Sequence, residues 1–200
     1  MLDKDRPTWQ LPAGLTRGAW DYVHEESIAV DYDRFHDGHP LLELDRRIIA
    51  NHTCEKRIRS ENNDDPAGKG SAANENSTPN DTDRRVAIDF GCGTGRNLVP
   101  FVQQGWSTIG VDLSIAMLKE CQVKLKQQWE ATGARDGPAF LQANMARLDC
   151  FAGEFADVAL CMYSSLGMVQ GRPNRRTFMS SVHRLLKPDG MFIVHVHNRG

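Results

Sequence analysis

Short apolar runs and longer amphipathic stretches alternate along the second half of the chain, and they predict alternating strands and helices. The apolar runs are residues 86–90, 107–112, 139–143, 157–163 and 191–197. The amphipathic stretches are residues 96–104, 114–132 and 175–186. Alternation at this spacing predicts an α/β fold, a doubly wound and mainly parallel sheet with right-handed crossovers.

The first 84 residues have a different pattern. Residues 19–36 mix aromatic and acidic side chains and predict a helix over part of their length. Pro40 suits the first position of a second helix, along which Leu41, Leu44 and Ile48 form an apolar stripe. Residues 60–83 contain no large apolar or aromatic side chain, which predicts disorder. We therefore predict an N-terminal helical cap (1–59), a disordered linker (60–84) and a core domain (85–200).

Composition excludes several classes of partner. The formal net charge is −2 and no long basic run is present, so we expect no nucleic-acid partner. No apolar run approaches the ~20 residues that span a bilayer, and the N-terminus lacks the apolar core of a signal peptide. The five cysteines are scattered and form no Cys-x-x-Cys pair, which indicates reduced thiols and no metal site. We expect a cytoplasmic protein, and the oligomeric state stays open.

A glycine-rich turn follows the first strand of the core domain. Gly91, Gly93 and Gly95 lie at the carboxyl end of that strand, where parallel sheets bind ligands. Asp112 ends the second strand, 21 residues after Gly91, and its carboxylate can accept hydrogen bonds from both hydroxyls of a ribose. A dinucleotide-binding fingerprint would place its third small residue at position 96, which is Arg96. This difference weakens a nicotinamide-binding interpretation.

Asp89 is a second unusual residue, because it places a carboxylate near the end of an otherwise apolar strand. A buried carboxylate needs hydrogen bonds or a cation. A ligand that carries an ammonium or a sulfonium group would satisfy it.

These motifs resemble those of the class I S-adenosylmethionine-dependent methyltransferases. Residues 86–95 fit that family's Asp/Glu-x-Gly-x-Gly-x-Gly loop, residues 110–114 are similar to the acidic end of its second strand, and residues 185–192 to its entry into the fifth strand. The resemblance covers residues 85–198 and implies a Rossmann-like fold with S-adenosylmethionine as cofactor. The family sheet has seven strands, but the sequence stops at Gly200, just after the fifth. We therefore expect the sheet to end after the fifth strand, either because the chain is a fragment or because it has lost the final hairpin.

The resemblance also implies a set of cofactor-binding residues. The backbone of the three glycines would line the methionine part, Asp89 would orient the loop or meet the ammonium group, and Asp112 would bind the ribose. Leu113 and Met145 would contact adenine, and Asn144 would accept a hydrogen bond from its amino group. The alternatives are structural acids at positions 89 and 112 and a turn residue at 144. The complete set is Asp89, Gly91, Cys92, Gly93, Gly95, Asp112, Leu113, Asn144 and Met145.

In-line transfer from a sulfonium needs alignment more than acid–base groups, so no catalytic triad is expected. Tyr163, Ser164 and His195 are the candidates should the acceptor have to lose a proton. The Asn/Asp-Pro-Pro-Tyr/Phe motif of adenine methyltransferases is absent at 161–164, which favours a small-molecule acceptor. Two alternatives stay open: an NAD(P)-dependent oxidoreductase, and a non-catalytic cofactor-binding domain.

Overall fold

The computed structural model describes residue 7 and residues 10–62, 85–132 and 136–197, without the side chains of 54–62. The predicted linker therefore lies outside the described residues, except for residues 60–62, which continue the third helix. Among the described helices, none is both long and apolar enough to cross a membrane.

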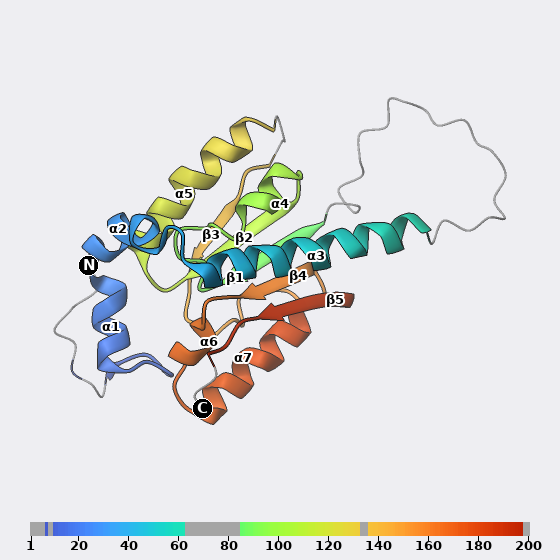
Figure 1. Ribbon diagram of the computed structural model, residues 1–200. Helices are drawn as coiled ribbons and strands as arrows, with labels where there is room; N and C mark the ends of the chain where they lie inside the picture. Colours follow the sequence, from blue (N-terminus) through green and yellow to red (C-terminus); the bar gives the residue numbers. More distant parts are fainter. Residues whose placement is uncertain (1–6, 8–9, 63–84, 133–135, 198–200) are drawn as a thin grey trace.

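The core domain is built on a five-stranded sheet in which every neighbouring pair is parallel, in the order β3-β2-β1-β4-β5. This arrangement confirms the predicted doubly wound fold, and β5 forms one edge of the sheet (Figure 1). Its strands are β1 (Val86–Phe90), β2 (Ser107–Asp112), β3 (Ala139–Gln142), β4 (Ala156–Cys161) and β5 (Leu186–Val194).

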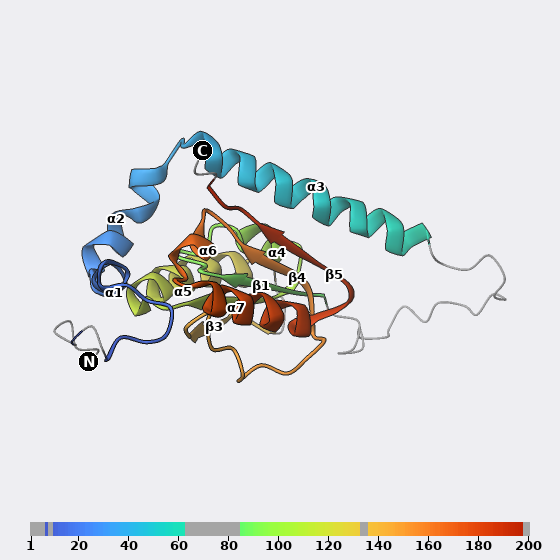
Figure 2. The same ribbon diagram turned by 90° about the horizontal axis from the view of Figure 1, so that it is seen from below.

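Helices cover both faces of the sheet because alternate strand residues point to opposite sides. On one face, Ala87 and Val158 pack with residues of α3 (Pro40–Asn62), α4 (Val99–Gln103) and α5 (Ile115–Glu130). On the other, Ile88 and Ala159 pack with α7 (Arg172–Leu185). Figure 2 shows α3 and α7 on opposite sides of the strands. The short helix α6 (Ser165–Met168), which the sequence pattern did not predict, follows β4.

The N-terminal segment forms α1 (Arg17–His24), α2 (Glu26–His36) and α3. Thr16 caps α1 by accepting a hydrogen bond from the amide of Ala19, 3.1 Å away. Pro40 begins α3, as predicted. The helices α1 and α2 lie beyond the carboxyl ends of the strands, on the side where the glycine turn is found (Figure 1).

Two local predictions were wrong. The helix predicted from residue 96 begins only at Val99, which puts Pro100 in the first turn, where its missing N–H breaks no helical hydrogen bond. The turn predicted at 187–190 lies within β5 as an irregularity of the strand. Ala156 pairs with Leu186 and Val158 with Met191, so four residues of β5 oppose one residue of β4.

Candidate functional site

The glycine turn is anchored on the neighbouring strand. The backbone amides of Gly91 and Cys92 both donate to the carbonyl of Val111, at 2.8 and 3.1 Å. Gly91 has a φ of +71°, and a Cβ there would lie 2.6 Å from Oγ of Ser165. Both the backbone conformation and the space therefore require glycine at position 91.

Asp112 fixes the turn from the end of β2. Its Oδ2 accepts a hydrogen bond from the amide of Gly93 (2.9 Å), and its Oδ1 accepts one from the amide of Ser114 (2.8 Å). Burial raises the pKa of Asp112, and the backbone hydrogen bonds oppose that shift. The amide of Leu113 also hydrogen-bonds to this carboxylate, which has about four lone-pair sites and can still accept from a further donor.

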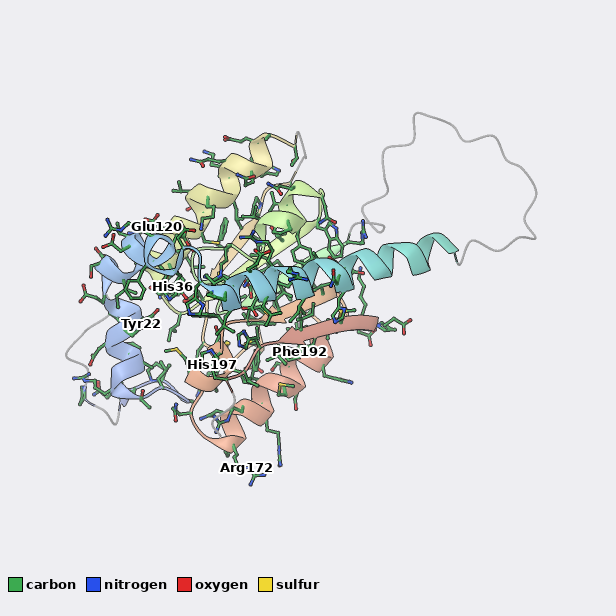
Figure 3. The ribbon with its side chains drawn as sticks, in the orientation of Figure 1. Tyr22, His36, Glu120, Arg172, Phe192 and His197 are labelled. Atoms are coloured by element: carbon green, nitrogen blue, oxygen red, sulfur yellow. The ribbon has the colours of Figure 1, made fainter. Side chains whose placement is uncertain are left out.

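A cavity of about 630 Å³ lies between this turn and the N-terminal helices. Six of the nine residues predicted to bind the cofactor line it: Gly91, Gly93, Asp112, Leu113, Asn144 and Met145. Tyr22, Tyr32 and His36 line it from α1 and α2. Figure 3 shows Tyr22 and His36 at the same end of the molecule as His197, which follows β5.

Asp89 lies behind the turn and is fully buried. Its Oδ2 has one long hydrogen bond, 3.5 Å, from the amide side chain of Asn97, and its Oδ1 has no partner among the described residues. Burial raises the pKa of Asp89 to about 7, although the Asn97 hydrogen bond and the charge of Arg96 oppose the shift. The carboxylate is therefore incompletely satisfied.

The side chains at positions 92 and 95 do not line the cavity. The thiol of Cys92 is buried in the core, where contact with Cys121 and burial raise its pKa. A Cβ on Gly95 would collide with Sγ of Cys121. Cys92 can thus reach a ligand in the cavity only through its backbone.

Asn144 lines the cavity, but protein groups already occupy its side chain. Its Nδ2 donates to the carbonyl of Ala13 (2.8 Å), and its Oδ1 accepts from the amide of Ala146 (2.8 Å). The second bond is that of an Asx turn, the alternative considered for this residue. The first holds the N-terminal segment at the rim of the cavity.

Tyr163 and Ser164 follow β4 and have φ values of +50° and +64°. Consecutive non-glycine residues in the left-handed region are strained, and such strain concentrates at functional sites. Tyr163 lines the cavity, whereas Ser164 accepts a hydrogen bond at its Oγ from the amide of His197 (3.2 Å). The ring of Tyr163 lies 5.5–6.3 Å from four imidazoles, those of His36, His39, His195 and His197.

His195 is held from outside the cavity. Its Nδ1 lies 2.8 Å from Oδ1 of Asp45, a residue of α3 that is only 2% exposed. His195 itself is absent from the cavity lining. Among the described residues, no group of three histidine, cysteine or acidic side chains is arranged to hold a metal ion.

Sequence reasoning missed the contacts that hold the N-terminal helices over the cavity. Asp33 of α2 accepts a hydrogen bond of 2.6 Å from the hydroxyl of Thr94 and forms an ion pair with Lys124 of α5. One feature of the sequence pointed to this position of the helices: residues 19–36 are rich in aromatic side chains. Three side chains of this stretch line the cavity, namely Tyr22, Tyr32 and His36.

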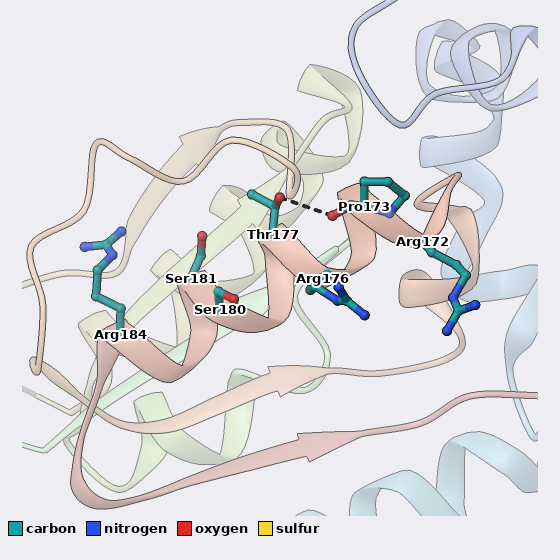
Figure 4. Close-up of a pocket in the computed structure, with 7 residues that line it drawn as sticks. All are labelled: Arg172, Pro173, Arg176, Thr177, Ser180, Ser181 and Arg184. Carbon is teal, nitrogen blue, oxygen red and sulfur yellow. Dashed lines mark hydrogen bonds between the residues drawn. The ribbon is translucent and has the colours of Figure 1, made fainter.

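A separate hollow of about 780 Å³ runs along the outer face of α7 (Figure 4). Arg172, Arg176 and Arg184 line it, and Arg184 donates to the carbonyls of Phe151 and Leu148, at 2.6 and 3.0 Å. None of the predicted cofactor residues lines this hollow.

Comparisons with known proteins agree with the geometry. Residues 88–194 match the family model described as "Methyltransferase domain". The chain is 31% identical over 111 residues to "Putative methyltransferase YqeM" of Bacillus subtilis, an alignment that covers 56% of this chain and 42% of that protein. It is 28% identical over 122 residues to glycine N-methyltransferase of Rattus norvegicus, and that alignment covers 56% of this chain and 40% of the rat protein. The chain thus spans about two fifths of the length of these relatives.

A solved structure described as a putative S-adenosyl-L-methionine-dependent methyltransferase from Methanococcus maripaludis shares the fold. Its TM-score is 0.57 at 15% identity, and the alignment covers 85% of this chain and 63% of that one. This similarity extends beyond the residues that the family model matches and includes the N-terminal part of the chain.

Proposed function

Because this chain belongs to the class I S-adenosylmethionine-dependent methyltransferases, we propose that it methylates a small-molecule acceptor by in-line transfer. The observation that carries the proposal is the cavity of about 630 Å³, which joins the glycine turn and Asp112 to the strained Tyr163. The match to this family argues against the nicotinamide-dependent alternative.

The residues around the cavity suit the family's cofactor. The nearest heavy atom to a Cβ built on Gly93 is 4.0 Å away, on Tyr32, so the loop backbone faces open space. We propose that the loop backbone holds the methionine part, that Asp112 accepts a hydrogen bond from the ribose, and that Leu113 and Met145 contact adenine. Asp89 would act from behind the loop, by orienting it.

The bound cofactor supplies an electrophilic methyl group on a sulfonium. The chain contributes alignment and exclusion of water, because α1 and α2 cover the cavity and Tyr22 and Tyr32 line it. The hydroxyl of Tyr22 is protonated and can donate a hydrogen bond, and burial raises its pKa further, to about 12. We place Tyr163 against the acceptor, and His195 behind it as a positioning residue.

A small-molecule acceptor is favoured by three observations. The Asn/Asp-Pro-Pro-Tyr/Phe motif is absent after β4, and the N-terminal helices cover the cavity. The rat relative is named for glycine, a small molecule. We also propose that residues 1–59 act as a cap on the domain formed by 85–200, and that the protein acts in the cytoplasm.

The test is transfer of labelled methyl groups into a fractionated cell extract. We expect label from S-adenosylmethionine to appear in the low-molecular-mass fraction, and Asp112→Ala to abolish it. Label confined to protein or nucleic acid would contradict the proposed acceptor class. Absence of any transfer by a chain that binds S-adenosylhomocysteine would favour the non-catalytic alternative.

A further inference from the structure

A second cavity, of about 490 Å³, lies next to the cofactor cavity. It is bounded by the junction of α2 and α3, by the end of the glycine turn and by Lys124 of α5. His36 lines both cavities. Arg96, which follows Gly95 directly, lines the second cavity near the boundary between the two.

The guanidinium of Arg96 lies against two tyrosines of the cofactor cavity. Its Cζ is 5.7 Å from the ring centroid of Tyr32 and 5.1 Å from that of Tyr163. Contact with the two rings and a hydrogen bond with the Tyr32 side chain restrict the guanidinium. A guanidinium has five N–H groups, so others remain for a ligand. The glycine turn is anchored on β2, so its contacts also limit the position of Arg96.

The other cations of the second cavity have acidic partners. Lys124 pairs with Asp33, and Arg46 pairs with Glu43 at 3.2 Å. Within the part of the chain that the structure describes, no carboxylate forms an ion pair with Arg96.

Two other acidic residues lie near this charge. Asp37 lines the second cavity and is exposed to solvent. Asp89 lies behind the turn, where burial raises its pKa and the charge of Arg96 opposes that shift without an ion pair between the two side chains. Arg96 is thus a half-buried cation beside both cavities.

We infer that Arg96 is an anion-binding residue of the acceptor site and that the acceptor carries a carboxylate or phosphate group. The inference rests on the proposed function and names the substrate class for that same site. A guanidinium binds planar or tetrahedral oxyanions through two parallel N–H groups. An acceptor held there from the second cavity lies beside Tyr163. His36 and His39 line the same cavity and offer further ring nitrogens.

A purely structural role for Arg96 makes a different prediction. If Arg96 only offsets the charge of Asp89 and supports Tyr32, small anions will not perturb it. The Nε–Hε resonance of an arginine in a ¹⁵N NMR spectrum reports directly on ligands at its guanidinium. This measurement needs no knowledge of the natural acceptor and no turnover.

The experiment uses the full chain saturated with S-adenosylhomocysteine, with the Arg96 resonance assigned from its loss in Arg96→Lys. We expect sodium acetate or inorganic phosphate to shift this resonance with half-saturation at about 1–10 mM. Acetamide at the same concentrations should leave it unmoved. Comparison of acetate with phosphate identifies the preferred anion. Arg46→Lys, which alters a paired cation of the same cavity, should leave the titration unchanged.

An unmoved Arg96 resonance at constant ionic strength, or an equal shift with acetamide, would overturn the inference. A uniform shift of all arginine resonances would overturn it as well, because it would show non-specific screening. Calorimetry separates this failure from that of the proposed function. A chain that binds no S-adenosylhomocysteine contradicts the function, whereas a chain that binds it without an anion response contradicts only the role of Arg96.

Discussion

The carboxylate of Asp33 accepts a hydrogen bond of 2.6 Å from the hydroxyl of Thr94 and thereby joins α2 to the glycine turn. Lys124 of α5 reinforces the contact, because its ammonium donates to Asp33 and, at 3.1 Å, to Thr94. The cover of the cavity and the loop beneath it are thus parts of one polar network.

This network should contribute to both stability and ligand binding. In a double-mutant cycle of Asp33→Asn and Thr94→Val, measured by urea unfolding, we expect a coupling of about 1 kcal/mol. S-adenosylhomocysteine should bind severalfold more weakly to Thr94→Val, because the loop loses its tie to α2. Thr177→Val is the control, since its hydroxyl bonds only within α7. Additive single effects would contradict the coupling.

Gly91 and Gly38 provide a matched pair of substitutions. Both have a φ of +71°, but a Cβ on Gly91 meets Ser165 at 2.6 Å, whereas a Cβ on Gly38 meets no atom within 4 Å. Gly38→Ala should lower the unfolding free energy by about 1 kcal/mol, from backbone strain alone. Gly91→Ala should lower the unfolding free energy by about 2 kcal/mol more than Gly38→Ala does, because its Cβ also overlaps Ser165. Equal losses in chemical denaturation would show that the turn adjusts without strain.

The buried carboxyl of Asp89 should make stability depend on pH. Burial raises its folded-state pKa to about 7, above the unfolded value of about 3.9. Between these values the folded state binds more protons, so its contribution to stability falls as pH rises from about 4 to 7. The slope is at most about 1.4 kcal/mol per pH unit for one group. Asp89→Asn should remove this contribution in urea unfolding measured across that range. An unchanged pH profile in the variant would contradict it.

Asp45 and His195 join α3 to the chain after β5. Removal of the imidazole in His195→Ala leaves a carboxylate that is 2% exposed without its partner, and should lower the unfolding free energy by about 3 kcal/mol. The double variant Asp45→Asn/His195→Gln retains a neutral hydrogen bond and should lose about 1 kcal/mol. His183→Ala, at an exposed position of α7, serves as the control. If the double variant lost more unfolding free energy than His195→Ala, the loss could not come from a buried carboxylate left without its partner.

The sequence was sufficient for features that depend on local pattern. The apolar runs located all five strands. The predicted parallel sheet puts the glycine turn and Asp112 at the same edge, because both follow or end a strand at its carboxyl end. In the structure β1 and β2 pair in parallel, with Phe90 opposite Val111. The turn and Asp112 therefore lie at that edge, although their role in binding the cofactor stays a prediction.

Features that depend on distant contacts were not predictable. Asp33 and Thr94 are 61 positions apart, and Asp45 and His195 are 150 apart, and no periodicity links such pairs. Arg96 was assigned to a helix on amphipathic pattern alone. The positive φ of Gly95 and the position of Pro100 delay that helix until Val99, which leaves Arg96 in the loop beside the second cavity.

Calorimetric titration with S-adenosylhomocysteine tests the assignment of the cofactor site most directly. We expect micromolar affinity, no binding of NADH, and a loss of about 10- to 100-fold in Asp112→Ala, where hydrogen bonds to a charged group disappear. Asp149→Ala, an exposed position outside the cavity, should bind as the unaltered chain does. Equal affinity in Asp112→Ala, or binding of NADH in place of S-adenosylhomocysteine, would contradict the assignment of the glycine turn and Asp112 as the cofactor site.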